Sequence, residues 1–318
     1  MLWVGWKKKI FNIFAIVGLS FLLSACKILV LQPEGLVAKA QRTLIITSFV
    51  LMLCIVIPVM IAIVVFAIKY HVSNKDREYL PEWSESYSIE CFTWGVPILI
   101  ITVLAILSGY FTYRYEPSKS LPILRADEKS LQIDAIALEW KWLFIYPEYG
   151  IATINEIYAP TGQQVFMQLT AESVMNAFWV PQLGTVIYAM PQMNAKLHLF
   201  SEKNGSFIGM PAHYSGEGFS GMGFKWYSVS RDAFENWVAR VRQSSLKLDR
   251  STYVALTRKS KRNSVLYFSG INKDLYYRVV NRCVLAGSKC NEDLMRLAAG
   301  KSLWGRICSV FDDGVNSE

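Results

Sequence analysis

The sequence predicts a membrane protein in two parts: a helical hairpin that crosses the bilayer twice, and an all-β sandwich that continues into a C-terminal arm. Three observations predict this fold class. Of the 318 residues 53% are apolar, and the apolar excess is concentrated near the start of the chain. Two runs there, residues 44–68 and 91–113, contain no charge and are long enough to span a bilayer as helices. After Pro122 the pattern changes to the alternation of apolar and polar residues that is typical of strands.

Residues 1–25 have the features of a bacterial export signal. Three lysines, Lys7 to Lys9, precede a short apolar stretch over residues 10–25. That stretch ends in Leu-Ser-Ala followed by Cys26, which resembles the lipobox of bacterial lipoproteins, where the chain is cut before the cysteine and the sulfur is acylated. We therefore expect lipidation at Cys26. The alternative is an ordinary membrane helix with a buried cysteine, but 16 residues are short for the ~20 that a span needs.

The two uncharged runs predict a transmembrane hairpin within residues 26–123. They are 25 and 23 residues long, and they contain Pro58 and Pro97, which helices in a bilayer tolerate better than helices in water. Two spans return the chain to the side from which it started. Because the signal exports the start of the chain, we expect the loop over residues 69–88 in the cytoplasm and both ends outside. The expected location is the bacterial inner membrane, with the C-terminal domain in the periplasm.

Residues 124–230 are predicted to form the β-sandwich. The clearest strand covers residues 136–146, where apolar side chains occupy every second position and Glu139 and Lys141 lie between them. This alternation predicts one strand with one packed face, formed by Ile136, Leu138, Trp140, Trp142, Phe144 and Tyr146. Shorter strands are predicted at residues 165–169, 195–199 and 224–229, between turns rich in Gly, Pro and Asn. Several short strands of this kind favour a sandwich or a barrel.

Residues 231–282 are predicted to form a helix and an extended arm. The helix covers residues 231–243, because its apolar side chains recur at helical spacing, at Phe234, Trp237, Val238 and Val241. Residues 283–318 form a tail to which the sequence assigns no role. Within it, Cys283 and Cys290 are expected to form a disulfide, since they lie on the oxidising side of the membrane. Free thiols, or a bridge to Cys308, are the alternatives.

Charge and cysteine content exclude two other classes of protein. The net charge is +8, from 33 basic and 25 acidic residues, but the basic residues are scattered and form no long run. An anionic lipid surface is therefore a more natural partner than nucleic acid. The six cysteines include no Cys-x-x-Cys pair, which argues against a zinc site.

Several motifs resemble subunit II of the haem-copper oxidases. Glu90 followed by Trp94 and Pro97 is similar to the signature that opens the second membrane helix of that family. The Glu-Trp-Lys-Trp stretch at residues 139–142 and the segment 179–184 are similar to its aromatic stretch and to the loop after its first copper ligand. Within the family the sequence is most similar to the cytochrome o ubiquinol oxidase branch, through residues 139–160, 214–225 and 264–280. The resemblance covers residues 19–280.

The resemblance implies a cupredoxin-like sandwich whose copper site is lost. In the copper-bearing branch two Cys, two His, one Met and a Glu carbonyl hold a binuclear copper centre. The matching positions in this chain are Asn176, Pro211, His213, Ser215, Phe219 and Met222. Only Met222 keeps its ligand, and a lone thioether cannot replace the soft thiolates that such a centre requires. A single histidine is also far short of a metal site. We therefore expect no metal and no cofactor in this chain, and we interpret Trp140, the electron entry position of the copper branch, as a packing residue.

The resemblance further implies that the chain is subunit II of a ubiquinol oxidase in the aerobic respiratory chain. Ubiquinol would be oxidised in subunit I, which would hold the haems and copper, reduce dioxygen to water and pump protons. The implied partners are subunits I, III and IV and the lipid bilayer. This chain would carry no catalytic residue. A menaquinol oxidase subunit remains an alternative, as does a lipoprotein for oxidase assembly or copper delivery, although the hairpin and the Glu90 motif argue against the latter.

Glu90 is the one candidate for a direct role in turnover. The matching Glu of the family lies at the mouth of a proton path into subunit I, so the resemblance implies proton entry here. The alternative is an acid at a helix N-terminus, stabilised by the helix dipole by ~0.3–1 kcal/mol.

Overall fold

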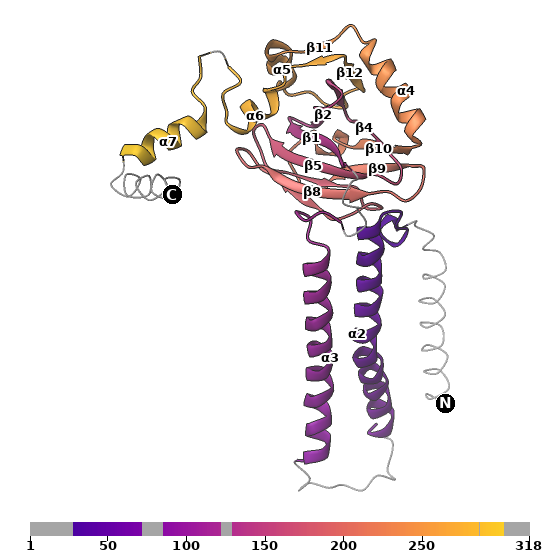
Figure 1. Cartoon of the computed structure of the whole chain (residues 1–318). Helices are drawn as coiled ribbons and strands as arrows, with labels where there is room; N and C mark the ends of the chain where they lie inside the picture. The colour runs from indigo at the N-terminus through magenta and orange to yellow at the C-terminus, as the bar shows by residue number, and fades with distance from the viewer. Residues whose placement is uncertain (1–27, 72–84, 122–128, 286, 302–318) are drawn as a thin grey trace, which may run out of the picture.

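The computed structural model describes residues 28–71, 85–121, 129–285 and 287–301. Two long helices stand beneath a β-sandwich, and the arm crosses the sandwich before it leads to a separate C-terminal helix (Figure 1). The predicted signal with Cys26, most of the loop between the two spans, and Cys308 lie outside the described residues.

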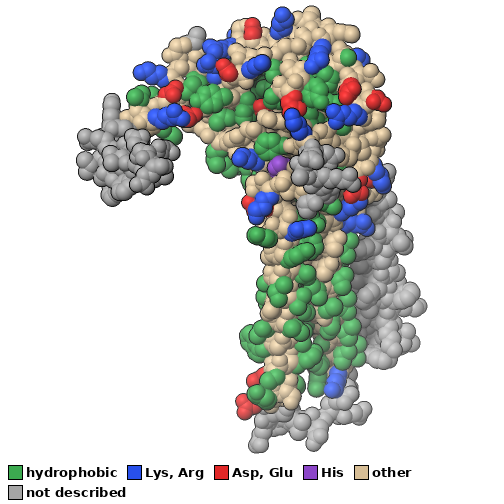
Figure 2. Space-filling view, viewed as in Figure 1, with side chains coloured by type: hydrophobic (Ala, Val, Ile, Leu, Met, Phe, Trp, Pro, Cys, Tyr) green, Lys and Arg blue, Asp and Glu red, His purple; other side chains and the backbone are tan. Residues whose placement is uncertain are grey.

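The hairpin consists of α2 (Leu36–Lys69) and α3 (Tyr87–Arg114), which pack side by side after a short 3-10 turn, η1 (Leu29–Leu31). Both helices extend beyond the predicted uncharged runs at each end, and both contain their proline, Pro58 or Pro97, without ending there. Each is long and apolar enough to cross a membrane. Hydrophobic side chains cover them over most of their length, whereas charged side chains gather where they meet the sandwich (Figure 2). The predicted hairpin is therefore present.

The sandwich consists of two sheets. The first has six strands in the order β12-β3-β2-β1-β5-β8, and the second has five in the order β4-β10-β9-β6-β7. Their bounds are β1 (Leu131–Leu138), β2 (Lys141–Tyr146), β3 (Ile151–Ile154), β4 (Glu156–Pro160), β5 (Gln164–Ala171), β6 (Asn176–Trp179), β7 (Ile187–Ala189), β8 (Ala195–Phe200), β9 (Gly205–Pro211), β10 (Phe224–Val229) and β12 (Leu266–Phe268). All three shorter strands predicted from the sequence are present, as β5, β8 and β10, and the sandwich fold is confirmed.

The core between the two sheets is built on aromatic rings. Phe178 and Phe224 are stacked at 4.9 Å between ring centroids, and Trp142 meets Phe178 edge-on at 5.5 Å. The ring centroid of Phe144 lies 5.3 Å from that of Phe224. Gly209 is opposite Phe224 on the neighbouring strand, and a Cβ atom there would lie 2.1 Å from that ring, so the position requires glycine. Side chains of this size, fully removed from water, supply most of the apolar stabilisation of the domain.

The prediction of one continuous strand over residues 136–146 is wrong. The chain reverses at Glu139 and Trp140, so that β1 and β2 form an antiparallel hairpin in which Leu138 lies opposite Lys141. Trp140 has φ +60°, the left-handed conformation that allows so tight a reversal. The reversal also divides the predicted packed face: Ile136 and Leu138 lie on one face of the sheet, whereas Trp142, Phe144 and Tyr146 lie on the other.

The chain passes from the first sheet to the second at Asn155, between β3 and β4. Its φ of +57° turns the backbone sharply, which Asn tolerates better than most residues. Its side-chain oxygen accepts a hydrogen bond from the Trp142 amide at 2.8 Å, and its side-chain amide donates to the Asn263 carbonyl at 3.2 Å. One buried side chain therefore holds the strand switch, β2 and the arm together.

The arm covers the outer face of the six-stranded sheet. Before the arm, α4 (Arg231–Arg242) packs its apolar side chains into the core between the two sheets. The arm comprises β11 (Lys247–Leu248), α5 (Arg250–Leu256), β13 (Gly270–Ile271) and α6 (Leu275–Val280), and α7 (Asn291–Lys301) follows it. The predicted helix is confirmed as α4, with its four apolar side chains buried. Ser230 caps this helix by accepting a hydrogen bond from the Ala233 amide. Cys283 and Cys290 form the expected disulfide. The sequence did not predict α5, α6 or α7.

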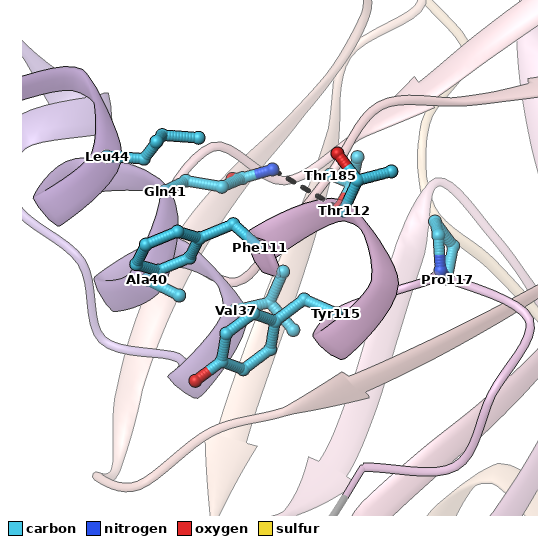
Figure 3. Close-up of a pocket in the computed structure, with 9 residues that line it drawn as sticks. All are labelled: Val37, Ala40, Gln41, Leu44, Phe111, Thr112, Tyr115, Pro117 and Thr185. Carbon is cyan, nitrogen blue, oxygen red and sulfur yellow. Dashed lines mark hydrogen bonds between the residues drawn. The ribbon is translucent and has the colours of Figure 1, made fainter. Parts of the chain in front are cut away.

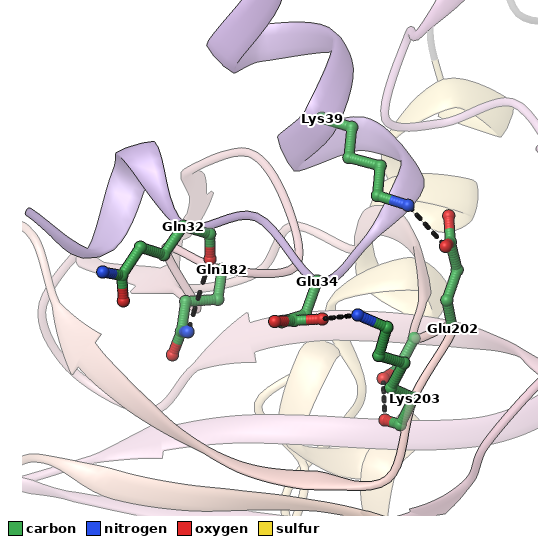
Figure 4. Close-up of polar contacts among 7 residues, drawn as sticks. Gln32, Glu34, Lys39, Gln182, Glu202 and Lys203 are labelled. Carbon is green, nitrogen blue, oxygen red and sulfur yellow. Dashed lines mark hydrogen bonds and ion pairs between the residues drawn. The ribbon is translucent and has the colours of Figure 1, made fainter.

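The hairpin is fixed to the sandwich at the start of α2. Gly35 lies so close to the sandwich that a Cβ atom would come within 2.5 Å of the Leu183 carbonyl oxygen. Lys39 bonds Glu202, and the Lys203 ammonium lies 3.7 Å from the Glu34 carboxylate (Figure 4). The Gln182 side chain also donates to the Gln32 carbonyl. These contacts orient the sandwich on its helices.

A cavity of about 200 Å³ remains between α2, α3 and the sandwich. Phe111 of α3 and Tyr115, directly after this helix, line it together with Val37 and Ala40 of α2 (Figure 3). Gln41 donates a hydrogen bond to Thr185 at 3.2 Å at its edge.

Candidate functional site

The six positions that the resemblance assigns to copper ligands lie at one end of the five-stranded sheet. Asn176 opens β6 and Pro211 ends β9, and these two strands are antiparallel neighbours. The Ala212 amide donates to the Ala177 carbonyl at 3.2 Å, so the chain stays beside β6 after β9 has ended. A loop carrying His213 and Ser215 then leads to η2 (Phe219–Gly221), with Phe219 at its start and Met222 directly after it.

Asn176 and Ser215 place polar atoms in this region without completing a ligand set. Asn176 is 1% exposed, and its side-chain amide donates to the Val174 carbonyl at 3.1 Å. Its side-chain oxygen and the Ser215 hydroxyl are buried and have no hydrogen-bond partner among the described residues. Both atoms are hard, neutral oxygens, which are poor ligands for electron-transfer copper.

Met222 and Phe219 serve packing. Met222 is fully buried in the core between the sheets, in the same cluster as Phe178 and Trp142. Phe219 lies 5.6 Å from the Tyr214 ring, measured between centroids. A thioether inside a dry aromatic core acts as an apolar filler.

The two histidines of the sandwich do not converge. His213 is partly exposed and meets Tyr188 edge-on at 6.3 Å between ring centroids. His198 lies on β8, where its ring packs 4.9 Å from Phe166 and its Nδ1 contacts the Gln164 amide. Burial, with a smaller contribution from Lys196, lowers the pKa of His198.

This donor set does not fit a binuclear copper centre. The six positions offer one imidazole and one thioether, and no thiolate. Within residues 28–71, 85–121, 129–285 and 287–301, no group of three or more His, Cys, Asp or Glu side chains could hold a metal ion. We therefore assign no metal chemistry to this loop.

Trp140 closes the site from the side of the β1–β2 turn. Its indole N–H donates to the Ser215 carbonyl at 3.0 Å, and the loop glycines pack flat on its ring. A Cβ atom on Gly218 would lie 2.3 Å from that ring. The ammonium groups of Lys259 and Lys261 lie 5.8 and 5.9 Å from the ring centroid, within the range of cation–π attraction. Trp140 thus joins the loop of residues 212–218 to the arm.

Lys141 is a residue whose importance the sequence did not reveal. The alternation of apolar and polar residues predicted that Lys141 faces solvent, yet Lys141 is 3% exposed. Its ammonium donates to the Arg258 carbonyl at 2.9 Å and to the Ser260 hydroxyl, which fixes the arm over the β1–β2 turn. Burial lowers the pKa of Lys141. The local sequence around Lys141 contains no signal for this burial, because the residues that cover Lys141 belong to the arm, which lies far away in the sequence.

Glu90 lies apart from the loop, at the opposite end of the hairpin. It occupies the first turn of α3 and is exposed. A carboxylate at a helix N-terminus is stabilised by the helix dipole, and proton entry at Glu90 stays a prediction.

A cupredoxin-like sandwich on a membrane hairpin, closed by an aromatic arm, defines the class of haem-copper oxidase subunit II proteins. The family model for cytochrome c oxidase subunit II, periplasmic domain, matches residues 108–229, and the model for the COX aromatic rich motif matches residues 242–287. Cytochrome bo(3) ubiquinol oxidase subunit 2 of Pseudomonas putida is 45% identical over 86% of this chain and 86% of its own length. The protein of the same name from Pseudomonas aeruginosa is 42% identical, over 83% of this chain and 78% of its own. Ubiquinol oxidase subunit 2 of Acetobacter aceti is 43% identical over 83% of this chain and 86% of its own length.

The chain therefore belongs to the family of the cytochrome bo(3) ubiquinol oxidase subunit 2 proteins. Membership and the two apolar helices make it an inner-membrane protein with a periplasmic domain. It is one subunit of an oxidoreductase complex, and it has partner subunits.

Proposed function

We propose that this chain is the structural subunit II of a ubiquinol oxidase, in which it carries no redox centre of its own. Subunit I oxidises ubiquinol, holds the haems and copper, reduces dioxygen to water and pumps protons, and subunits III and IV complete the complex. The hairpin anchors the sandwich against these membrane partners. The sandwich caps the complex on the periplasmic side.

The observation that carries this proposal is the set of side chains at the six positions that match the copper ligands of the copper-bearing branch. Pro211 and Ser215 stand at the two thiolate positions, and Met222 is enclosed in the aromatic core. A soluble electron donor would therefore find no acceptor behind Trp140, and electrons must enter another subunit from a membrane-soluble donor. The names of the relatives, at 42–45% identity, support ubiquinol as that donor.

The test is purification of the complex through a tag on this chain. We expect co-purifying subunits that contain haem, oxygen consumption with ubiquinol, and none with reduced cytochrome c. Faster turnover with menaquinol than with ubiquinol would identify menaquinol as the substrate. Recovery of the chain without any haem-containing subunit would contradict the proposal and favour an assembly factor.

Glu90 is proposed to deliver protons to subunit I from the cytoplasmic edge of α3. A carboxylate can bind and release a proton at this edge while it stays hydrated, whereas a glutamine cannot. We expect Glu90→Gln to leave subunit composition and haem content unchanged and to slow ubiquinol oxidation several-fold, with a milder effect for Glu90→Asp. Unchanged turnover of Glu90→Gln in a complex of normal composition would assign Glu90 to the helix N-terminus alone. The control is Glu85→Gln, an exposed acid just before the same helix.

Lipidation at Cys26 is proposed to add a second attachment to the membrane. Mass spectrometry of the mature protein should find an acylated Cys26 as its first residue. Cys26→Ser should leave the precursor uncut but held by its two spans. Detection of Met1 in the native protein would contradict the proposal.

A further inference from the structure

The sandwich end of α2 carries a hollow of about 500 Å³ that none of these roles uses. Its α2 lining has helical spacing, so these side chains lie on one face of the helix. The lining residues are Pro33, Lys39, Arg42, Thr43, Ile46 and Thr47. Its volume is within the range of about 300–1,000 Å³ that is typical of small-molecule sites.

The hollow lies at the boundary between headgroups and hydrocarbon. The uncharged run of α2 begins at Leu44, two residues after Arg42. At ~1.5 Å per residue, Ile46 lies about 6 Å deeper in the membrane than Arg42. Below it α2 exposes further apolar side chains, including Phe49 and Val50. The hollow thus has a basic end at headgroup level and an apolar end within the bilayer.

The charges around the hollow do not cancel. Lys39 is paired with Glu202, and Lys203 with Glu34, so these four residues neutralise one another (Figure 4). Arg42 is exposed, and no carboxylate within the described part of the chain pairs with it. One uncompensated guanidinium therefore remains at the basic end.

We propose that this hollow binds an anionic glycerophospholipid of the phosphatidylglycerol class. The Arg42 guanidinium contacts the phosphate, because its fork of N–H groups matches two phosphate oxygens. An acyl chain follows α2 past Ile46. A zwitterionic lipid brings its own cation to the phosphate and is bound less well beside Arg42. This site is independent of quinol oxidation and requires only that α2 spans the membrane.

The test uses the purified oxidase complex in phosphatidylcholine nanodiscs that contain increasing phosphatidylglycerol. Lipid retained per complex is counted by mass spectrometry after release. We expect Arg42→Gln to weaken phosphatidylglycerol retention about five-fold, and Arg42→Lys, which keeps the charge but not the fork of N–H groups, to weaken it less. The matched control is Arg114→Gln, which removes an exposed charge from the sandwich end of α3, outside the hollow. It should retain phosphatidylglycerol as the wild type does.

Three results would overturn the proposal. The first is equal retention in wild type and Arg42→Gln, or equal loss in Arg42→Gln and Arg114→Gln. The second is displacement of the lipid by excess inorganic phosphate, which would identify a site for free anions. The third is a photo-crosslink from Ile46→benzoylphenylalanine to a partner subunit, which would show that protein covers the hollow. A crosslink to lipid is the expected result.

Discussion

The two faces of the six-stranded sheet both bury apolar clusters but differ in their polar contacts. The inner face meets the second sheet through a dry cluster of aromatic rings around Phe144 and Phe178. The outer face also buries apolar side chains, but the arm that covers it is fastened by polar contacts. Lys141 bonds the arm backbone at Arg258, and the Tyr253 hydroxyl bonds the Glu172 carboxylate. Both faces are therefore packed, and the outer one adds specific polar bonds to a second apolar cluster, to which the arm contributes Leu248, Tyr253 and Leu275.

The largest effect is expected from truncation on the inner face. Phe144→Ala removes a fully buried ring from the aromatic cluster and leaves a cavity, so we expect a loss of about 3–5 kcal/mol in the free energy of unfolding. Denaturant unfolding of the chain in detergent, followed by tryptophan fluorescence, measures it. Tyr214→Ala is the control, because that ring is 72% exposed and its loss should change stability little. Equal effects of the two changes would show that the inner face is not the main source of stability.

Asp134 provides a pH-dependent test of the outer face. It is buried beneath the arm, where desolvation raises its pKa from 3.8 to about 6, opposed in part by a hydrogen bond from Gln132. Because the folded pKa is the higher one, the folded state prefers the protonated acid. The resulting stability is fully present below pH ~4 and is lost as the pH rises to ~6, by up to roughly 3 kcal/mol.

Asp134→Asn mimics the neutral acid. The substitution should therefore stabilise the arm at neutral pH and remove the dependence of its stability on pH between about 4 and 6. Hydrogen exchange of α6 between pH 4 and 7.5, corrected for intrinsic rates, reports the difference. Asp274→Asn, a change at an exposed acid on the same arm, is the control. If the stability of α6 depended on pH in Asp134→Asn as it does in the wild type, a raised pKa of Asp134 would be refuted.

The disulfide between Cys283 and Cys290 should stabilise the end of the arm alone. Closing so short a loop contributes ~2–3 kcal/mol at most in the entropic model. Replacing both cysteines by serine should therefore speed hydrogen exchange over residues 275–291 while inner-face unfolding stays unchanged. The control is Cys54→Ser, a thiol on the exposed face of α2 that forms no bridge. Labelling of Cys283 and Cys290 by a thiol reagent without reductant would contradict the bridge itself.

Sequence patterns were sufficient where local chemistry determines the structure. Uncharged length predicted α2 and α3, helical spacing predicted α4, and the oxidising compartment predicted the disulfide. They failed at Trp140, because alternation continues through a turn whose left-handed backbone is held by a distant loop.

The burial of Asp134 and Lys141 was equally hidden from the sequence. Lys141 is a charged residue on a predicted strand and Asp134 lies two residues before that strand, and charged residues normally face water. They are buried because the arm, more than 100 residues further along the chain at Arg258, returns to cover the sheet. Contacts of such long range leave no local pattern.

The most direct test of a subunit without a redox centre is the copper content of the full-length chain. The purified protein is incubated with cuprous and cupric copper, desalted, and examined by metal analysis and by its visible and near-infrared spectrum. We predict far less than one copper per chain, no mixed-valence band, and the same result for Met222→Leu. Stoichiometric copper with a purple mixed-valence spectrum, lost in Met222→Leu, would contradict the account.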